Sequence, residues 1–550
     1  MFSLMAVLLV APHVTAFVCL FLTEYGPLAQ SLAFLGWGFL NCLLLLLLRR
    51  PALSAALSLA LIVIVILVSR FKFGVTWMTI TFLDILIVDS DSFAFLLNTI
   101  PDLRMSLLIA AALGVPAAIL LWSFDPFRVR RRVALAGAGL CLTGLATLSA
   151  IYPEQPWEPF QGVNHVSNFS RSAVLSVSEL TTKGWLEIDS AVADPTGELS
   201  EHVCQPASRP PHIIMVLDES SFDIRAAPGI KVPPDYAGHF RSIDGRERIL
   251  LTEATGGPTW YTEYNVLTGL SARSFGRLKF YVTRIAAGRV ERGLPQALRR
   301  CGYRTVSLYP AYGAFLSARR FQKSAGVERL FDAGEMGAGD LEPDSFFYDK
   351  ALNLIGREHM EAPLFLFVYT IANHFPWDKT FRPDLTPPGW QPPGNTVEVD
   401  EYIRRQTMSA RDYASFIARL KRDFPDEKFL IVRFGDHPPA LSHRIMDPAL
   451  NDSEIAQRVM NYDPDFYSTY YVIDAVNFAP ASLTTARSRL DAPYLPLVVQ
   501  EAAGLPLDPT FREQKHILER CEGVFYACKD GAEASRFNRL LMDAGLLKGF

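Results

Sequence analysis

The sequence lacks several patterns that would point to common protein classes. Basic residues do not form a stripe interleaved with aromatic residues, and the formal net charge is −4, so we expect no nucleic acid as a partner. None of the seven cysteines lies in a Cys-x-x-Cys pair, which argues against a zinc site of that type. Long stretches of the first 150 residues also lack charge, although 20% of the chain is charged. This last absence indicates a membrane protein.

Five apolar runs predict membrane-spanning helices. A helix needs about 20 apolar residues to cross the hydrocarbon core, and each run is near that length, although the third is short. Five such runs in so short a segment argue against helices buried in a soluble core. The first run lacks a basic start and a small-residue cleavage site, so we expect it to stay as an anchor. The runs are 4–23, 28–48, 53–69, 105–123 and 133–151.

Arginines predict the orientation of these spans. Basic residues follow the second run at 49–50 and the fourth run at 128–132. The loop after the third run carries only Arg70 and Lys72, offset by aspartates. The positive-inside rule places the N-terminus in the cytoplasm, and an odd number of spans then places the rest of the chain outside. We therefore expect a multi-pass protein of a bacterial cytoplasmic membrane that faces the periplasm or the exterior. One span more or fewer would reverse this.

The segment 75–100 is apolar but carries Asp84, Asp89 and Asp91. Three carboxylates at bilayer depth would be costly. An interfacial or re-entrant helix is therefore favoured over a sixth span, and both interpretations remain open.

The cysteines agree with an exported domain. Three lie in the apolar runs and are expected to be inert hydrophobic residues. The other four form an even number, and an oxidising compartment permits two disulfides. Cys521 with Cys528 closes a short loop and is the favoured pair, and Cys204 with Cys301 then follows by elimination.

Composition divides the chain into an all-α anchor at 1–152, a proline-rich connector at 153–210 and a globular domain at 211–550. The connector contains a helix-like stretch at 170–188. Inside the globular domain, short runs rich in Val, Ile and Phe alternate with helical patterns such as 293–302 and 409–424. Runs of this kind are typical of parallel strands buried on both faces, so the pattern predicts an α/β domain. The four runs are 212–217, 304–309, 364–370 and 429–434.

Polar residues follow three of these predicted strands directly. Glu219 comes after the first, Asn373 and His374 after the third, and Asp436 and His437 after the fourth. Because ligands bind at the carboxyl ends of strands in open α/β sheets, we expect these side chains to share one site. Taken singly, such residues are more often helix caps or turn residues, but the combination is far more specific.

A threonine completes the candidate site. Thr259 follows Gly256-Gly257-Pro258, which predicts a tight turn, and a threonine hydroxyl beside a cation can act as a nucleophile. Together with Glu219, Asp436 and His437 it makes a mostly oxygen ligand set that favours Mn²⁺, Mg²⁺ or Zn²⁺. His374 would lie near the substrate and transfer a proton or bind a phosphate oxygen.

Four motifs carry a resemblance to a known family. They are VLDESSFD (216–223), GGPTWYTEYNVLTGL (256–270), IANHFPW (371–377) and FGDHPP (434–439). With them the chain resembles the lipoteichoic acid synthase and periplasmic-glucan phosphoglycerol transferase group, a membrane-anchored branch of the alkaline phosphatase/sulfatase superfamily. The segment YLPLVVQEAAGLP (494–506) is also similar. The resemblance implies an alkaline phosphatase/sulfatase-like α/β catalytic domain after the anchor.

The resemblance also implies roles for particular residues. It makes Glu219, Thr259, Asp436 and His437 the metal ligands, with Thr259 also the nucleophile, and His374 a residue for the substrate phosphate or for proton transfer. The family has a substrate-binding arginine after an aromatic residue. In FLSARRFQ (315–322) this spacing departs by about one residue, so Arg319 is favoured and Arg320 remains open. His443 would line the site, although a solvated loop histidine is an equal alternative.

The implied activity is a metal-dependent transfer of a phosphoglycerol-type group. Phosphatidylglycerol is the expected lipid donor, a glycan or other hydroxyl the acceptor, and Mn²⁺ the first choice of cation. A phosphoethanolamine transferase, or a silent membrane protein that binds lipid or glycan, is the alternative. Sulfatase chemistry is disfavoured, because Cys204-Gln-Pro-Ala-Ser lacks the arginine of the formylglycine motif and threonine holds the nucleophile position.

Overall fold

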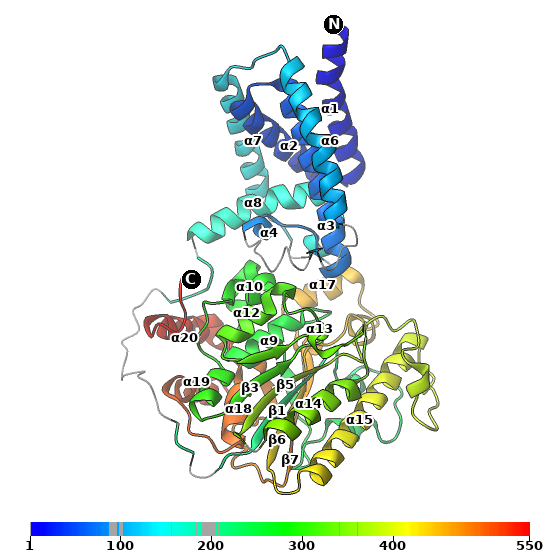
Figure 1. Cartoon of the computed structure of the whole chain (residues 1–550), viewed down its shortest axis with the longest axis vertical. Coiled ribbons are helices and arrows are strands. Elements are labelled where there is room, and N and C mark those ends of the chain that lie inside the picture. Colours follow the sequence, from blue (N-terminus) through cyan, green and yellow to red (C-terminus); the bar gives the residue numbers. More distant parts are fainter. Residues whose placement is uncertain are drawn as a thin grey trace. The chain divides into compact units, whose positions relative to one another are not determined.

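The computed structural model describes residues 2–76, 78–86, 96–97, 103–155, 157–182, 184–189, 204–206, 209–339, 341–359 and 361–550. The chain forms two compact units, Met1–Gly184 and Trp185–Phe550 (Figure 1). The first is helical and the second is built on a mixed sheet.

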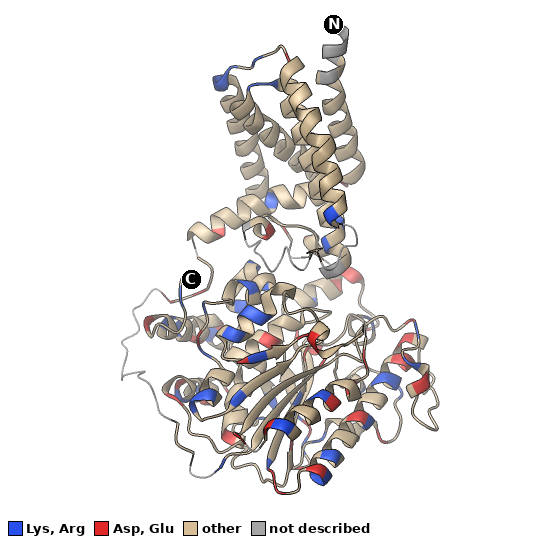
Figure 2. Ribbon diagram, viewed as in Figure 1, with Lys and Arg blue, Asp and Glu red and all other residues tan. Residues whose placement is uncertain are grey.

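All five predicted spans of the N-terminal unit are helical: α1 Phe2–Thr23, α2 Pro27–Leu48, α3 Pro51–Thr76, α6 Leu103–Phe124 and α7 Arg131–Ile151. Among the described residues, four helices are long and apolar enough to cross a membrane: Pro27–Leu48, Pro51–Gly74, Leu103–Phe124 and Arg131–Ile151. Helix α1 is also apolar, and the part of it that is fully described is Leu9–Thr23. Charged residues are sparse along these helices and frequent on the C-terminal unit (Figure 2). Four candidate spans are therefore established, and the fifth remains a prediction.

Helix α3 is longer than the third apolar run. It continues through Arg70 and Lys72, which the sequence pattern placed in a loop. The added turns are stabilised because Lys72 Nζ forms an ion pair with Asp84 Oδ2 at 2.8 Å, in the short helix α4 (Phe82–Leu86). Half of 75–100, including Asp89 and Asp91, lies outside the described residues, so the choice between an interfacial segment and a sixth span stays open.

Helix α8 (His165–Thr182) belongs to the N-terminal unit, where it packs against α2, α3 and α7 (Figure 1). Its polar side is buried. The Glu24 carboxylate accepts hydrogen bonds from the backbone N–H of Val166 at 2.8 Å and the Ser167 hydroxyl at 2.6 Å. His165 pairs with Ser69 Oγ at 2.9 Å. The predicted helix thus starts earlier than 170 and is part of a packed unit, while the domain boundaries at 152 and 210 stay predictions.

The C-terminal unit contains an eight-stranded sheet in the order β4-β3-β5-β1-β6-β7-β2-β8. The four apolar runs are the strands β1, β3, β5 and β6, all parallel, as predicted. Strand β7 pairs antiparallel with β6, which the sequence pattern did not indicate. The strands are β1 His212–Asp218, β2 Ile249–Leu251, β3 Arg304–Leu308, β4 Arg329–Phe331, β5 Leu364–Thr370, β6 Phe429–Gly435, β7 Ser468–Val476 and β8 Arg489–Asp491.

Helices pack on the sheet (Figure 1). On one side, α14 (Asp344–Glu358) and α15 (Val397–Asp423) bury Phe347, Ile355 and Phe416 against Ile214 and Leu366 of the central strands. This apolar burial is the main stabilising term of the domain. Helix α9 (Thr259–Thr268) packs against α10, α11 and α18. The other helices are α10 Val282–Ala286, α11 Leu294–Arg300, α12 Ala318–Ser324, α13 Ala333–Met336, α16 Ser442–Ile445, α17 Asp452–Met460, α18 Leu495–Ala502, α19 Pro509–Arg520 and α20 Ala532–Asp543.

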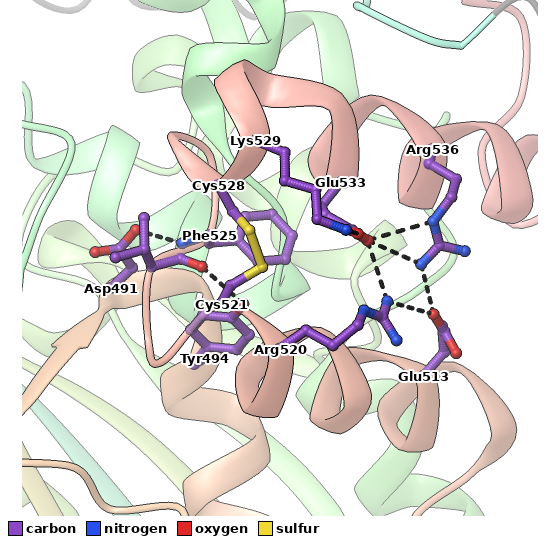
Figure 3. Close-up of a disulfide and its surroundings, with 11 residues drawn as sticks. Asp491, Tyr494, Glu513, Arg520, Cys521, Phe525, Cys528, Lys529, Glu533 and Arg536 are labelled. Atoms are coloured by element: carbon purple, nitrogen blue, oxygen red, sulfur yellow. Dashed lines mark hydrogen bonds and ion pairs between the residues drawn. A yellow bond between two sulfur atoms is a disulfide. The ribbon is translucent and has the colours of Figure 1, made fainter.

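Both predicted disulfides are present, Cys204–Cys301 and Cys521–Cys528. The second joins the end of α19 to the turn before α20 (Figure 3). Beside it, ion pairs link the two helices: Arg520 Nη2 lies 3.1 Å from Glu533, and Arg536 Nη2 lies 2.6 Å from Glu513 (Figure 3). The three cysteines of the N-terminal unit are free thiols.

The two disulfides should differ in their effect on stability. Cys204–Cys301 spans 97 residues and Cys521–Cys528 spans seven. A longer loop loses more entropy in the unfolded chain, so removing the first pair should cost about 4 to 5 kcal/mol and the second about 2 kcal/mol. Chemical unfolding of the paired Cys→Ala variants measures this, and an equal or larger loss from the short loop would contradict it.

Candidate metal centre

The site begins where β1 and β6 end. These strands are parallel neighbours with Asp218 opposite Gly435, so Glu219 and Asp436 leave the sheet side by side. His437 follows at once, and the three side chains are 9%, 0% and 1% exposed. One potential ligand atom from each lies within 4.8 Å of the others.

The predicted fourth member, Thr259, joins this cluster. Its Oγ1 donates a hydrogen bond to Glu219 Oε2 at 2.9 Å. His437 Nε2 lies 3.4 Å from Glu219 Oε1 and 3.3 Å from Asp436 Oδ2. The structure therefore brings all four predicted ligand residues together, from three separate parts of the chain.

The side chains fit a divalent cation. Asp436 Oδ2 and His437 Nε2 are buried and have no hydrogen-bond partner among the described residues, an arrangement that is costly without a further partner. His437 Nδ1 lies 3.0 Å from the carbonyl of Pro438, which favours the tautomer that leaves the Nε2 lone pair free for a metal. Two carboxylates, one imidazole and one hydroxyl suit a hard or borderline cation.

The electrostatics are those of a crowded buried cluster. Burial would raise the pKa of Glu219, but the adjacent His437 lowers it to about 2, with a smaller contribution from His374. Burial would lower the pKa of His437, but the charges of Asp436 and Glu219 raise it to about 9. Burial and the neighbouring Glu219 raise the pKa of Asp436 well above its usual value. Without a cation, the cluster therefore retains protons that a metal would displace.

The backbone around the cluster is tightly constrained. Ser220 has a positive φ of 52° and donates its N–H to Asp436 Oδ1 at 2.7 Å. The N–H of His437 donates to the same oxygen at 2.8 Å. A Cβ on Gly435 would lie 1.8 Å from the carbonyl oxygen of Ser221, so only glycine allows β1 and β6 to end this close together.

Thr259 lies at the start of α9, partly exposed, after Gly256 with a φ of 75°. The N-terminus of a helix favours negative charge, which suits a phosphate bound beside this hydroxyl. One turn further on, Thr262 Oγ1 donates to the backbone carbonyl of Asp436 at 2.6 Å. This bond fixes α9 to the β6 loop and therefore fixes Thr259 relative to the other ligands.

His374 and His443 have different surroundings. His374 follows β5, is partly exposed, and its Nδ1 lies 2.9 Å from the carbonyl of Phe375. His443 Nε2 hydrogen-bonds Thr255 Oγ1 at 2.7 Å, and its ring lies against Gly256. Burial and the charge of His437 lower the pKa of His443 to about 4, so it is neutral. His443 thus supports the turn before Thr259, and its predicted contact with substrate stays a prediction.

Arg319 is engaged elsewhere. Its guanidinium donates to the carbonyl of Leu330 at 2.9 Å and forms ion pairs with Asp332 at 2.9 Å and Glu335 at 2.7 Å, at the start of α13. Glu219, Asp436 and His437 are not among these partners. The alternative, Arg320, is exposed on α12. A substrate role for either arginine stays a prediction.

The sequence interpretation missed the groups beneath the cluster. Arg433 is fully buried in β6, and its Nη1 donates to Asp218 Oδ2 at 2.8 Å, while the Tyr470 hydroxyl donates to the same carboxylate. Behind Thr259, Glu263 is buried and accepts a hydrogen bond from Gln322 at 2.8 Å, and burial raises its pKa to about 7. The signal for Arg433 was present, since an arginine inside FLIVRF interrupts an otherwise apolar run.

Known proteins are similar to this chain over the region that contains most of these residues. The Sulfatase family model matches residues 226–468, which include Thr259, His374, Asp436 and His437. The capsular polysaccharide biosynthesis protein RkpI of Rhizobium meliloti is 25% identical over 292 residues, 52% of this chain and 49% of that protein. Lipoteichoic acid synthase 2 of Bacillus subtilis is 23% identical over 150 residues, 26% of this chain and 22% of that protein. The chain thus spans about half or less of these curated relatives.

Among solved structures, the phosphoglycerol transferase GacH of Streptococcus pyogenes in complex with sn-glycerol-1-phosphate has a TM-score of 0.47 and 15% identity. The match covers 62% of this chain and 87% of that one.

Gly435→Ala should damage the site and the fold together. The added methyl group has no space beside the Ser221 carbonyl, so we expect a loss of about 3 kcal/mol or more in unfolding free energy and loss of cation binding. Gly238→Ala is the control, because a Cβ there meets nothing within 4 Å and the residue does not have a positive φ. Calorimetric unfolding with and without Mn²⁺ compares the two, and equal behaviour would contradict the tight contact.

Without a cation, the contribution of the cluster to the free energy of unfolding should fall as pH rises. The stabilisation that Mn²⁺ adds should instead grow as pH rises. The pKa of His437 is raised from 6.5 to about 9, so its contribution is present below about pH 6.5 and is lost as pH rises through 9. Metal binding requires deprotonated ligands, so the increase in melting temperature caused by Mn²⁺ should grow over the same range.

Thermal unfolding of wild type and Asp436→Asn at pH 6, 7.5 and 9 tests this. The variant should show no shift with Mn²⁺, whereas the exposed-site control Asp465→Asn should match wild type. A shift that persists in Asp436→Asn would rule out this cluster as the cation site.

Proposed function

Because the chain is a membrane-anchored member of the sulfatase/alkaline phosphatase superfamily, we propose that it transfers a phosphoglycerol-type group from a phospholipid to a hydroxyl acceptor. Phosphatidylglycerol is the proposed donor and a glycan the proposed acceptor. The reaction would take place on the outer face of a bacterial cytoplasmic membrane.

One observation carries this proposal: the partly exposed Thr259 hydroxyl lies 2.9 Å from a carboxylate of the buried ligand cluster. Threonine cannot be converted to the formylglycine that sulfate-ester hydrolysis uses in this superfamily, so phosphoryl transfer is favoured. A silent binding protein would have no need to keep two buried carboxylates and an imidazole together against their electrostatic cost.

The first half-reaction forms a covalent intermediate. Thr259 Oγ attacks the phosphorus of the phospholipid, a bond forms between them, and the bond from phosphorus to the diacylglycerol oxygen breaks. The Thr259 hydroxyl loses its proton to solvent, because Glu219, with its pKa lowered to about 2, is a poor base, and His374 gives a proton to the leaving oxygen. Diacylglycerol departs, and phosphoglycerol stays attached to Thr259.

The second half-reaction releases the group. The acceptor hydroxyl attacks the same phosphorus and gives its proton to His374, while the bond to Thr259 Oγ breaks and that oxygen regains its proton. A divalent cation held by Glu219, Asp436, His437 and Thr259, proposed to be Mn²⁺, would supply Lewis-acid stabilisation of the charge on phosphorus-bound oxygens.

The N-terminal helices explain how a lipid serves as donor. Four candidate spans keep the enzyme in the bilayer that contains the substrate, which raises its effective concentration. A phosphoethanolamine transferase would use the same residues with a different head group, and the mass of the covalent intermediate separates the two.

Thr259→Ala should abolish transfer. With labelled phosphatidylglycerol and Mn²⁺, wild type should release diacylglycerol, and the variant should lose at least about a thousandfold in rate because the nucleophile is gone. Thr407→Ala is the matched control, since that hydroxyl donates to the Ile403 carbonyl of its own helix. Equal release by wild type and Thr259→Ala would refute the assignment.

A trapped intermediate should carry the head group. Peptide mass analysis after a quench should find glycerophosphate on the Thr259 peptide of wild type. A phosphoethanolamine adduct, formed when phosphatidylethanolamine is supplied instead, would decide for the alternative.

A further inference from the structure

The loop that carries His374 is held from behind by one helix. It follows β5, and its backbone carbonyls point at Arg405 of α15. This guanidinium donates from Nη1 to the carbonyl of His374 at 2.6 Å, and from Nη2 to the carbonyls of Pro376 at 2.7 Å and Lys379 at 3.0 Å. One side chain therefore fixes three points of the loop.

Arg405 is itself held in place. It is 2% exposed, and its Nε donates to Glu401 Oε1 at 2.7 Å, one turn earlier on the same helix. Glu401 also accepts from Arg404 Nε at 2.8 Å and from the backbone N–H of Phe381 at 2.9 Å. Buried charges are costly unless they are fully paired, and here the loop backbone completes the pairing. The loop and the charges therefore stabilise each other.

The same stretch of α15 also holds the loop of the metal centre. The Tyr402 hydroxyl donates to the carbonyl of Ser220 at 3.0 Å and accepts from the N–H of Phe222 at 3.1 Å. Gln406 Nε2 donates to the carbonyl of Phe222 at 2.9 Å. Asn373, next to His374, donates from Nδ2 to the Ser220 carbonyl at 3.2 Å. Residues 401–406 of α15 therefore hold both loops in place.

We propose that Arg405 is a positioning residue that sets His374 at its working distance from the Glu219–Asp436–His437 cluster by clamping the carbonyls of residues 374–379. The proposal rests on the proposed role of His374 in proton transfer. Arginine suits this task because its planar fork carries five donors, whereas lysine offers three from one point and would lose part of the clamp.

Hydrogen–deuterium exchange tests the clamp without any need for turnover. In Arg405→Lys, amides of 371–381 should exchange at least about tenfold faster, while those of the β6 segment 429–437 keep the wild-type rate. Arg411→Lys, an exposed arginine of the same helix, should change neither segment. Unchanged exchange in 371–381 would overturn the proposal.

Kinetics then separate positioning from general stability. Arg405→Lys should lower kcat about tenfold or more, since small displacements of a catalytic group are costly, with KM and the Mn²⁺-induced rise in melting temperature unchanged. In a His374→Ala background the same change should alter kcat by less than about twofold, because Arg405 acts through His374. Equal losses in both backgrounds would overturn the proposal.

Two further outcomes keep the test decisive. If Arg405→Lys does not fold, Glu401→Gln replaces it, since this change removes the charge that anchors Arg405 while keeping the side-chain shape. If wild type shows no transfer at all, the proposed function fails, and the exchange experiment still decides whether Arg405 clamps the loop.

Discussion

The site depends on the parallel pairing of β1 with β6. With Asp218 opposite Gly435, the two strands deliver Glu219 and Asp436 to one point without any loop having to reach across the sheet. Gly435 permits the approach, because any larger residue would meet the Ser221 carbonyl. Beneath it, the buried ion pair between Arg433 and Asp218 joins the same two strands through their side chains. Separating the two side chains would leave an unpaired buried charge, so the ion pair favours the observed alignment of the strand ends.

The remaining functional groups are attached to this strand pair by hydrogen bonds. Thr262 joins α9, and therefore Thr259, to the carbonyl of Asp436. Tyr402 and Arg405 join α15 to the two loops that follow β1 and β5. The arrangement of these groups is thus held by buried polar contacts as well as by apolar packing. This is the form that preorganised charge stabilisation requires.

Much of this arrangement is visible in the sequence. Continuous Val, Ile and Phe runs identify β1, β3, β5 and β6, since strands buried on both faces need apolar residues at every position. Once those runs are placed in one parallel sheet, the polar residues that follow them must converge, so Glu219 and the Asp436-His437 pair are predictable. The even number of cysteines outside the apolar runs permits two disulfides, and the short loop between Cys521 and Cys528 favours the observed pairing without fixing it.

Other features depend on tertiary contacts that no local pattern records. The antiparallel direction of β7 is not encoded in the strand's own composition, and β2, β4 and β8 are three residues long, too short for a periodic signal. Arg319 follows an aromatic residue as a substrate-binding arginine would, yet it pairs with Asp332 and Glu335 because α13 folds beside it. The extension of α3 depends on Lys72 meeting Asp84 from a later segment.

If the ends of β1 and β6, with the start of α9, form one cation site, anomalous scattering from Mn²⁺ in crystals of the full chain should reveal the bound ion. We expect one strong peak enclosed by Glu219, Asp436 and His437 and in contact with Thr259 Oγ1. A well-ordered cluster with no peak, or a peak bound by other residues, would show that these residues do not form a cation site.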